Sequence, residues 1–285
     1  MFPFRKILFP VDYSAPCEAV IPYLREIAQR FSASITLVHA YALEELAHSE
    51  LALTDPELAD EVRTFGEERL RKFALEKFPG QQVDTSTALG EAGSVIHNFV
   101  QHQGTDLVML ATHGRGPIRR FLLGSVAAKV LHDVSAAVWT GTAAILTNHT
   151  PQIPYRSVLC ALDESEEAEG VLRFAAAFST RYEAHLSLVQ VVEMPPPTVE
   201  MDYSPYKKDI LDAADVRLRE LKGRVGVEAP HAVLDATVSD GVREEAVRRK
   251  ADLIVLGRGR AQGTFRMLSH VYPVIRESPC PVLSI

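Results

Sequence analysis

Four residues of one short stretch, His113, Gly114, Gly124 and Ser125, have types and a spacing suited to holding phosphate. A buried-strand pattern precedes them, and a helical pattern begins at Ser125. Backbone N–H groups at a helix start point outward, and the helix dipole favours negative charge there. Glycine lets a phosphate reach the backbone, and the serine hydroxyl adds a donor. The stretch therefore predicts an anion site, with a tight turn and a helix cap as the alternative reading.

A second polar residue of interest, Asp12, ends a short apolar run at residues 5–12. A carboxylate at the carboxyl end of a central parallel strand lies where open α/β sheets bind ligands. A turn or cap residue is the alternative role. The following helix is expected to be capped by Ser14, with Pro16 in its first turn. Pro22 predicts a kink or a later helix start, because proline removes a helix hydrogen bond.

Strand and helix patterns alternate through the first half of the chain, which indicates an α/β fold. A parallel sheet with helices on both faces and right-handed crossovers is expected from this order. Further strands are expected at residues 34–40, 83–89, 106–111 and 136–140.

The second half of the chain repeats the first. Residues 155–165 match 4–14, and residues 252–257 match 106–111. The segment between the halves carries turn residues and no helix or strand period. We therefore predict a first domain at 1–146, a linker at 147–154 and a second domain at 155–285.

Pro10-Val11-Asp12 after the first strand, and Thr112-His113-Gly114-x9-Gly124-Ser125 after the fourth, resemble motifs of the universal stress protein (UspA) family. With the repeat, the chain is most similar to its tandem-domain members. The resemblance implies two tandem five-stranded, parallel-sheet, Rossmann-like domains of the adenine nucleotide alpha hydrolase-like type. It also implies an intrachain pseudo-dimer in which Val138-Trp139 and Val282-Leu283 meet at the sheet edges. A further homodimer is an open alternative.

The same resemblance implies that the first domain binds ATP, with Mg²⁺ carried by the nucleotide as an open alternative. Asp12 would take the adenine end, together with the backbone near Pro10 and Val11. The ribose, the phosphates and the loop lining would involve Leu110, Ala111, His113, Gly114, Arg115, Gly124, Ser125 and Val126.

Two departures from the family pattern bear on this expectation. Ala111 stands where the family has its first glycine. The alanine is expected to weaken nucleotide binding if that position needs a positive φ or close ligand approach, and to have no effect on binding if the position is strand-like. In the second domain, Ser269 and His270 stand where the first has Gly124-Ser125, although Asp163 matches Asp12. The second domain is expected to bind nucleotide weakly or not at all.

Composition limits the partners. The net charge of −7 argues against nonspecific nucleic-acid binding. No apolar run approaches the roughly 18 residues of a membrane span. The N-terminal residues lack the succession of regions that defines a signal peptide, and they are expected to form a strand. Three separated cysteines suit a reducing cytoplasm.

His97 and His102 do not have the spacing that places two metal ligands on one helix face, so no metal site built by the protein alone is expected.

A nucleotide-binding regulatory protein of the cytoplasm is the leading hypothesis. The chain lacks G-x4-G-K-[ST] and a G-x-G-x-x-G after its first strand, which excludes P-loop NTPases and disfavours dinucleotide enzymes. No dedicated catalytic residue is expected, and slow ATP hydrolysis stays an alternative. The other hypotheses are an interaction protein that has lost nucleotide binding, and an ATP-using transferase or hydrolase with an unrecognised site.

Overall fold

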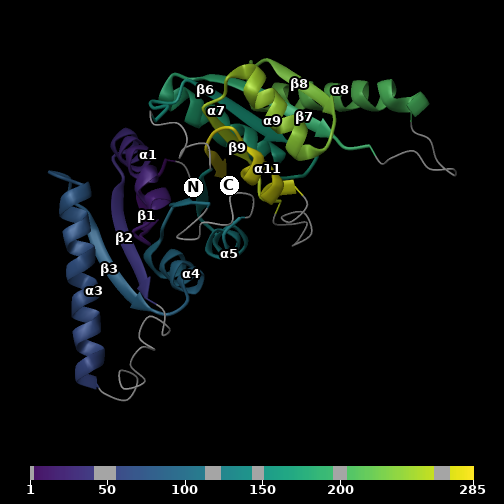
Figure 1. Ribbon diagram of the computed structural model, residues 1–285. Helices are drawn as coiled ribbons and strands as arrows, with labels where there is room; N and C mark the ends of the chain where they lie inside the picture. The colour runs from purple at the N-terminus through teal and green to yellow at the C-terminus, as the bar shows by residue number, and fades with distance from the viewer. Residues whose placement is uncertain (1–2, 42–55, 113–122, 143–150, 195–203, 260–269) are drawn as a thin grey trace, which may run out of the picture. The chain divides into compact units, whose positions relative to one another are not determined.

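The computed structural model describes residues 3–41, 56–112, 123–142, 151–194, 204–259 and 270–285. They form two compact units, Met1–Leu146 and Thr147–Ile285. Each unit is an α/β layer structure built on five parallel strands (Figure 1).

The first unit alternates strands and helices. Its elements are β1 (Lys6–Pro10), α1 (Ala15–Phe31), β2 (Ser34–Tyr41), α3 (Pro56–Lys77), β3 (Asp84–Leu89), α4 (Ala92–Gln103), β4 (Leu107–Ala111), α5 (Ser125–Asp133) and β5 (Ala137–Gly141). The strand order is β3-β2-β1-β4-β5, and the pairs are parallel.

The second unit repeats this plan. Its elements are β6 (Ser157–Leu162), α7 (Ala168–Tyr182), β7 (His185–Val192), the 3-10 turn η2 (Ser204–Tyr206), α8 (Lys207–Val225), β8 (His231–Asp235), α9 (Val238–Arg249), β9 (Leu253–Leu256), α11 (Tyr272–Glu277) and β10 (Val282–Ser284). The strand order β10-β9-β6-β7-β8 is the same topology as in the first unit. The expectation of two five-stranded parallel-sheet domains is therefore confirmed.

Helices cover both faces of each sheet. In the first unit α4 and α5 contact each other on one face, and Figure 1 shows α3 on the opposite side. In the second unit α7 contacts α8, and α9 contacts α11. Because both faces are covered, the central strands are buried throughout, and the runs Ile7–Phe9 and Leu107–Met109 are almost fully inaccessible.

The order of the strands fixes where a ligand can enter. The chain leaves β1 toward β2 on one side, whereas β4 lies on the other side. Such a reversal opens a crevice outside the carboxyl ends of the two strands. The equivalent reversal in the second unit lies between β6 and β9.

Helix α1 begins where the sequence predicts. The Ser14 side chain accepts a hydrogen bond from the Cys17 N–H at 3.2 Å, so Ser14 is the N-cap. Pro22 neither delays nor interrupts the helix, which runs unbroken from Ala15 to Phe31, so the expected later start is wrong. The cap at Ser14 and the buried apolar face of the helix outweigh the hydrogen bond that proline removes.

The only tryptophan of the chain, Trp139, lies in the core of the first unit. Its side chain is fully buried on β5, and its ring centroid is 5.2 Å from that of Tyr23 on α1.

Glu91 caps α4 and gives a first prediction about stability. Its carboxylate accepts hydrogen bonds from the N–H groups of Gly93 and Ser94, each at 2.8 Å. Burial alone would raise the pKa of Glu91, but these hydrogen bonds and the Ser94 hydroxyl lower it overall. Because the folded pKa is lowered, the stabilisation is complete above the unfolded pKa and is lost as pH falls through the folded one.

We therefore expect Glu91→Ala to cost about 1 kcal/mol of unfolding free energy at neutral pH, the usual cost of losing a cap. The difference from the unchanged protein should shrink in acid, as the carboxylate becomes protonated. Urea denaturation at neutral and acidic pH measures both. Glu68→Ala removes an exposed carboxylate of α3 and is the charge-matched control. An equal cost at both pH values would contradict the capping role.

Candidate functional site

A cavity of about 360 Å³ lies at the strand reversal of the first unit. It is lined by the carboxyl ends of β1, β2 and β4 and by the first residues of α4 and α5. Eight of the eleven residues predicted to bind nucleotide line it, namely Pro10, Val11, Asp12, Leu110, Ala111, Gly124, Ser125 and Val126. The other three, His113, Gly114 and Arg115, lie outside the described residues.

Asp12 is held in a fixed orientation beside this cavity. Its Oδ1 atom accepts hydrogen bonds from the Ser14 N–H at 2.9 Å and from the Ser14 hydroxyl at 2.6 Å. The same Ser14 hydroxyl caps α1. The carboxylate is therefore positioned by the start of α1, and it presents a pre-oriented acceptor at the end of β1.

The start of α5 supplies the opposite kind of group. Gly124 is the N-cap and has no side chain to satisfy the first N–H groups of the helix. Those groups have no carbonyl partner within a helix, and the dipole makes this end positive. Residues 125–127, the first three of α5, line the cavity. The cavity thus has donors suited to an anion together with an acceptor at Asp12.

Gly124 lies so close to Thr112 that a Cβ atom at this position would be a tight fit. Its N–H donates to the Thr112 carbonyl at 2.9 Å. A Cβ atom at position 124 would stand 3.1 Å from that same oxygen. A side chain at position 124 therefore requires Thr112 to shift by a few tenths of an ångström, whereas glycine fits this junction without a shift.

Ala111 is part of a strand, and this decides whether an alanine in place of the family's first glycine disturbs the backbone. It is the last residue of β4 and pairs with Gly141 of β5 in the parallel ladder. Extended backbone is open to any residue, so alanine needs no strained conformation here. The departure from the family pattern therefore adds one methyl group to the cavity wall and leaves the backbone path intact.

His39 lines the cavity without having been predicted to do so. Its Nδ1 atom lies 2.7 Å from the Val11 carbonyl oxygen, and its ring is 4.8 Å from that of Tyr13. The Tyr13 ring also lies beneath the guanidinium of Arg69, at 3.9 Å. A polar residue near the end of the second strand was the available signal, but its use requires knowing that β2 lies beside β1.

Cys17 also lines the cavity, and its environment makes it inert. Burial raises the pKa of its thiol to about 12. Because the thiolate is the reactive form, this cysteine is not a nucleophile at neutral pH. Cys160 and Cys280 are buried as well, as expected for small apolar residues, and burial raises both of their pKa values.

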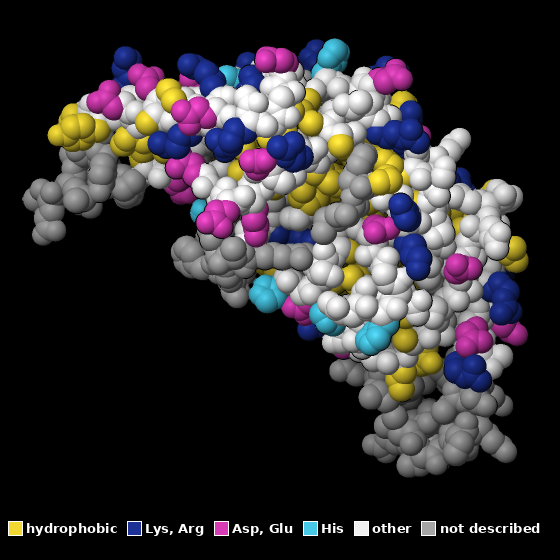
Figure 2. Space-filling model, turned by 180° about the vertical axis from the view of Figure 1, so that it is seen from behind, with side chains coloured by type: hydrophobic (Ala, Val, Ile, Leu, Met, Phe, Trp, Pro, Cys, Tyr) yellow, Lys and Arg dark blue, Asp and Glu magenta, His cyan; other side chains and the backbone are white. Residues whose placement is uncertain are grey.

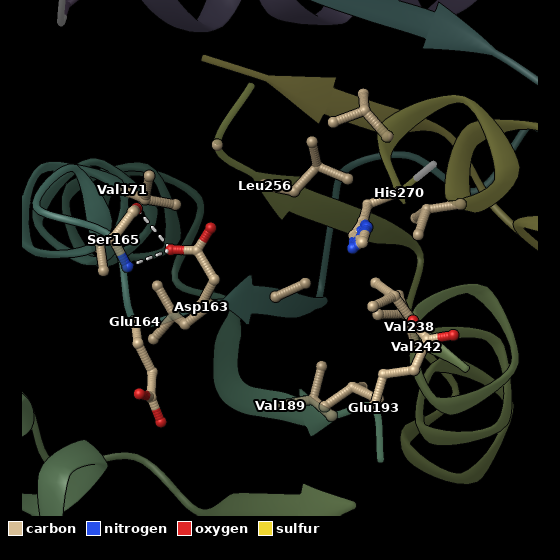
Figure 3. Close-up of a pocket in the computed structure, with 17 residues that line it drawn as sticks. Asp163, Glu164, Ser165, Val171, Val189, Glu193, Val238, Val242, Leu256 and His270 are labelled. Carbon is tan, nitrogen blue, oxygen red and sulfur yellow. Dashed lines mark hydrogen bonds between the residues drawn. The ribbon is translucent and has the colours of Figure 1, made fainter. Parts of the chain in front are cut away.

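The second unit holds a larger cavity of about 490 Å³ in the equivalent position (Figure 3). Asp163 lies at the end of β6, and its Oδ1 accepts from the Ser165 N–H at 2.9 Å and hydroxyl at 2.5 Å. His270 and Glu193 also line this cavity, between walls of valine and leucine. The match of Asp163 to Asp12 thus extends to the same pair of hydrogen bonds.

A metal centre has little support in what the structure describes. Within the described ranges there is no group of three or more His, Cys, Asp or Glu side chains placed to hold an ion. The two histidines considered from sequence contact carbonyl oxygens instead, His97 that of Asp133 at 3.1 Å and His102 that of Asn98 at 2.8 Å.

The described helices and surface bear on membranes and nucleic acids. None of the described helices is both long and apolar enough to cross a bilayer. On the face shown in Figure 2, basic and acidic side chains are interspersed over the described residues. A continuous basic stripe, which tracks a nucleic-acid backbone, is not a feature of that face among those residues.

Comparison with known proteins gives consistent matches for both halves of the chain. The model of the universal stress protein family matches twice, at residues 3–140 and 154–285. A putative universal stress protein of Staphylococcus haemolyticus is 25% identical over 141 residues, which is 48% of this chain and 84% of that protein.

Among solved structures, a universal stress protein of Archaeoglobus fulgidus aligns with a TM-score of 0.69 at 22% identity, over 98% of this chain and 95% of its own. A putative universal stress protein of Pseudomonas aeruginosa aligns with a TM-score of 0.68 at 15% identity, over 99% and 93% of the two chains. At these identities the structures support the fold alone.

Proposed function

Since the chain belongs to the universal stress protein family, as two successive matches to the family model show, we propose that it is a regulatory protein whose first unit binds ATP. The nucleotide state then changes the affinity of the chain for its partners or the pairing of its domains. In this proposal the chain acts as a binding protein, and catalysis is not required of it.

One observation carries the proposal: the start of α5, where the N-cap Gly124 offers no side chain, and the oriented carboxylate of Asp12 line the same cavity. The N–H groups at a helix start suit phosphate, and the Ser125 hydroxyl adds a donor. Asp12 accepts hydrogen bonds, which suits the donor groups of an adenosine. The cavity therefore offers the two complementary ends that an adenine nucleotide requires.

The apolar wall of the cavity fits the remaining part of such a ligand. Val11, Val38, Val95, Ile96 and Leu110 line it between the polar ends. A flat heteroaromatic ring packs against apolar side chains of this kind, while a few polar groups fix its orientation. Any Mg²⁺ would be carried by the phosphates of the nucleotide.

Rapid hydrolysis is not part of the proposal. Oδ1 of Asp12 accepts two hydrogen bonds from Ser14, and we assign this side chain to the adenosine end. The proposal therefore gives no described residue of this cavity the role of a general base. Turnover should be slow, so that bound ATP acts as a lasting signal.

Asp12→Ala tests the assignment, and the second unit provides its matched control. We expect Asp12→Ala to weaken ATP binding about tenfold, equivalent to about 1.4 kcal/mol. Asp163→Ala removes the same carboxylate and the same two hydrogen bonds from the repeated unit, and it should leave ATP affinity unchanged. Calorimetric titration of the full chain with ATP and Mg²⁺ measures both.

Equal effects of the two substitutions would show that the site is misplaced. Absence of ATP binding at millimolar nucleotide would remove the proposal altogether. Mass spectrometry of small molecules that copurify with the chain identifies which adenine nucleotide it carries.

A further inference from the structure

We propose that Tyr13 is a positioning residue for ligand binding in the first unit, and that Arg69 and Phe73 of α3 hold it in place. In this role Tyr13 orients the carboxylate of Asp12 without touching the ligand itself. The inference rests on the proposed function, because it concerns the carboxylate assigned to the adenosine end. It deepens that function by making α3 an element that sets the affinity for nucleotide.

The backbone of Tyr13 has an unusual conformation. Its φ angle is +60°, in the left-handed region that bulky side chains rarely adopt. Among the described residues, the other non-glycine residues with positive φ are the C-caps of α1, α7 and α9, namely Ser32, Glu183 and Lys250. A left-handed residue commonly ends a helix, which accounts for those three. Tyr13 instead precedes a helix, and such strain persists only where surrounding contacts stabilise it.

The ring of Tyr13 is held by side chains from β2 and α3. Its centroid lies 4.8 Å from that of His39 on β2. The Phe73 ring meets it edge-on at 5.4 Å between centroids, and the guanidinium carbon of Arg69 lies 3.9 Å from the Tyr13 centroid. Edge-to-face aromatic pairs and cation–π contacts are both attractive. Because Arg69 and Phe73 are four residues apart, one face of α3 holds the ring.

The conformation of Tyr13 bears directly on Asp12. The Asp12 carboxylate accepts hydrogen bonds from the N–H and the hydroxyl of Ser14, so a closed turn spans Tyr13. Ser14 is fixed as the N-cap of α1. On the other side of Asp12, the carbonyl oxygen of Val11 lies 2.7 Å from Nδ1 of His39. A change in the backbone of Tyr13 therefore reorients Asp12 relative to α1 and to the cavity.

The second unit shows that the hydrogen bonds of this turn do not fix its middle residue. Asp163 accepts the same two hydrogen bonds from Ser165 (Figure 3). Glu164, which stands where the first unit has Tyr13, nevertheless has no positive φ. Its carboxylate accepts a hydrogen bond from Gln190 at 3.0 Å. The turn thus has two conformations within one chain, and the side-chain contacts of the middle residue select between them.

An arginine from the equivalent helix reaches the middle residue of the turn in both units. In the first unit, Arg69 of α3 lies against the ring of Tyr13. In the second unit, Arg217 of α8 donates from Nε to Glu164 at 3.0 Å. The contact is cation–π in one unit and an ion pair in the other. A connection kept with different chemistry points to a role for the connection itself, which joins this helix to the turn that carries the aspartate.

Tyr13 and Arg69 act from outside the cavity. Neither is among the residues that line it, whereas Asp12 is. Arg69 is exposed, so a partner that binds α3 and displaces its guanidinium weakens the hold on Tyr13. This gives a physical route by which partner binding and nucleotide binding affect each other, and such coupling is reciprocal.

Calorimetric titration of the full chain with ATP and Mg²⁺ tests the inference. Tyr13→Leu keeps a bulky side chain but loses the ring contacts. It should weaken ATP binding about fivefold, less than the loss of about tenfold expected for Asp12→Ala. Tyr13→Phe keeps the ring and should restore most of the lost affinity. In a chain that already carries Asp12→Ala, Tyr13→Leu should have no further effect, because no carboxylate is left to orient.

Arg69→Gln tests the contact from the side of α3. It removes the cation and keeps much of the stem, and it should weaken ATP binding about threefold. Arg71→Gln is the matched control, because it removes the same charge from an exposed position two residues along, on a different face of α3. The control should leave ATP affinity unchanged, with circular dichroism checking that every variant is folded. Equal losses for both arginines would contradict a role for the contact with Tyr13.

A second measurement needs no nucleotide. Hydrogen exchange of the Ser14 amide, followed by NMR, reports on its hydrogen bond to Asp12. Without the ring contacts the turn passes between its two conformations, and each passage breaks this bond transiently. Exchange should therefore be at least about threefold faster in Tyr13→Leu and in Arg69→Gln, and unchanged in Arg71→Gln. Unchanged exchange in Tyr13→Leu would overturn the inference, and so would undiminished ATP affinity in that variant.

The two proposals fail in different ways. If the unchanged chain binds no ATP while the Ser14 amide responds as described, the proposed function fails and the positioning of Asp12 by α3 stands. If ATP binds and Asp12→Ala weakens it, but Tyr13→Leu and Arg69→Gln have no effect on affinity or exchange, only the inference about Tyr13 fails.

Discussion

Gly124→Val should weaken ATP binding at least about 100-fold, equivalent to about 2.7 kcal/mol. The reason is steric: a Cβ atom at this position already stands 3.1 Å from the Thr112 carbonyl oxygen, and valine adds two methyl groups. We expect the junction to widen around the valine side chain, which would move the first N–H groups of α5 away from the phosphates they would bind. Calorimetric titration with ATP and Mg²⁺ measures the loss.

A glycine of the other unit provides the control. Gly170 lies in α7, and a Cβ atom there would meet nothing within 4 Å. Gly170→Val should therefore keep ATP affinity within about twofold, since it changes the same residue type without touching the first cavity. If Gly124→Val also binds ATP normally while remaining folded, α5 does not hold the phosphates.

Phe178→Ala should have the largest effect on stability, a loss of about 3–5 kcal/mol. Phe178 is fully buried on α7, and its ring is 4.7 Å from Tyr182 and 5.8 Å from Tyr155, measured between centroids. Removing it leaves a cavity among aromatic rings that pack at close to crystalline density. Chemical denaturation followed by circular dichroism measures the change.

Phe178→Leu separates cavity formation from loss of the ring contacts. Leucine fills much of the space, so this variant should lose clearly less stability than Phe178→Ala. A similar loss for both variants would mean that the ring–ring contacts dominate. No significant loss for Phe178→Ala would contradict the assignment of this cluster to the core.

The architecture could be predicted from the sequence because the pattern of strands and helices that indicates it occurs twice. The apolar runs at 7–9 and 107–109 predict buried parallel strands, and the same runs recur in the second half. Asp12, Gly124 and Ser125 were predicted to share a site, and the fold brings all three to one cavity. Whether that cavity binds ATP stays a prediction.

Other features depend on which strands are neighbours, and no local pattern encodes that. His39 and Glu193 reach the cavities only because β2 lies beside β1 and β7 beside β6. The conformation of Ala111 likewise required the ladder between β4 and β5. The size of the second cavity could not be predicted either, because the motif differences at His270 indicate lost phosphate contacts and say nothing about remaining volume.

Several predictions still await their measurements. The pairing of the two units through Val138-Trp139 and Val282-Leu283, and a homodimer, can be tested by cross-linking and by sedimentation. The cytoplasmic location can be tested by fractionation.

The buried position of Trp139 gives the chain a built-in optical label. It is the only tryptophan, and it lies in the first unit against Tyr23. Selective excitation of the indole ring will therefore give a fluorescence signal from the proposed ATP-binding half, whereas far-ultraviolet circular dichroism averages over both halves. Recording the two signals along one denaturation curve can resolve the order in which the duplicated halves unfold, without labelling or truncating the chain.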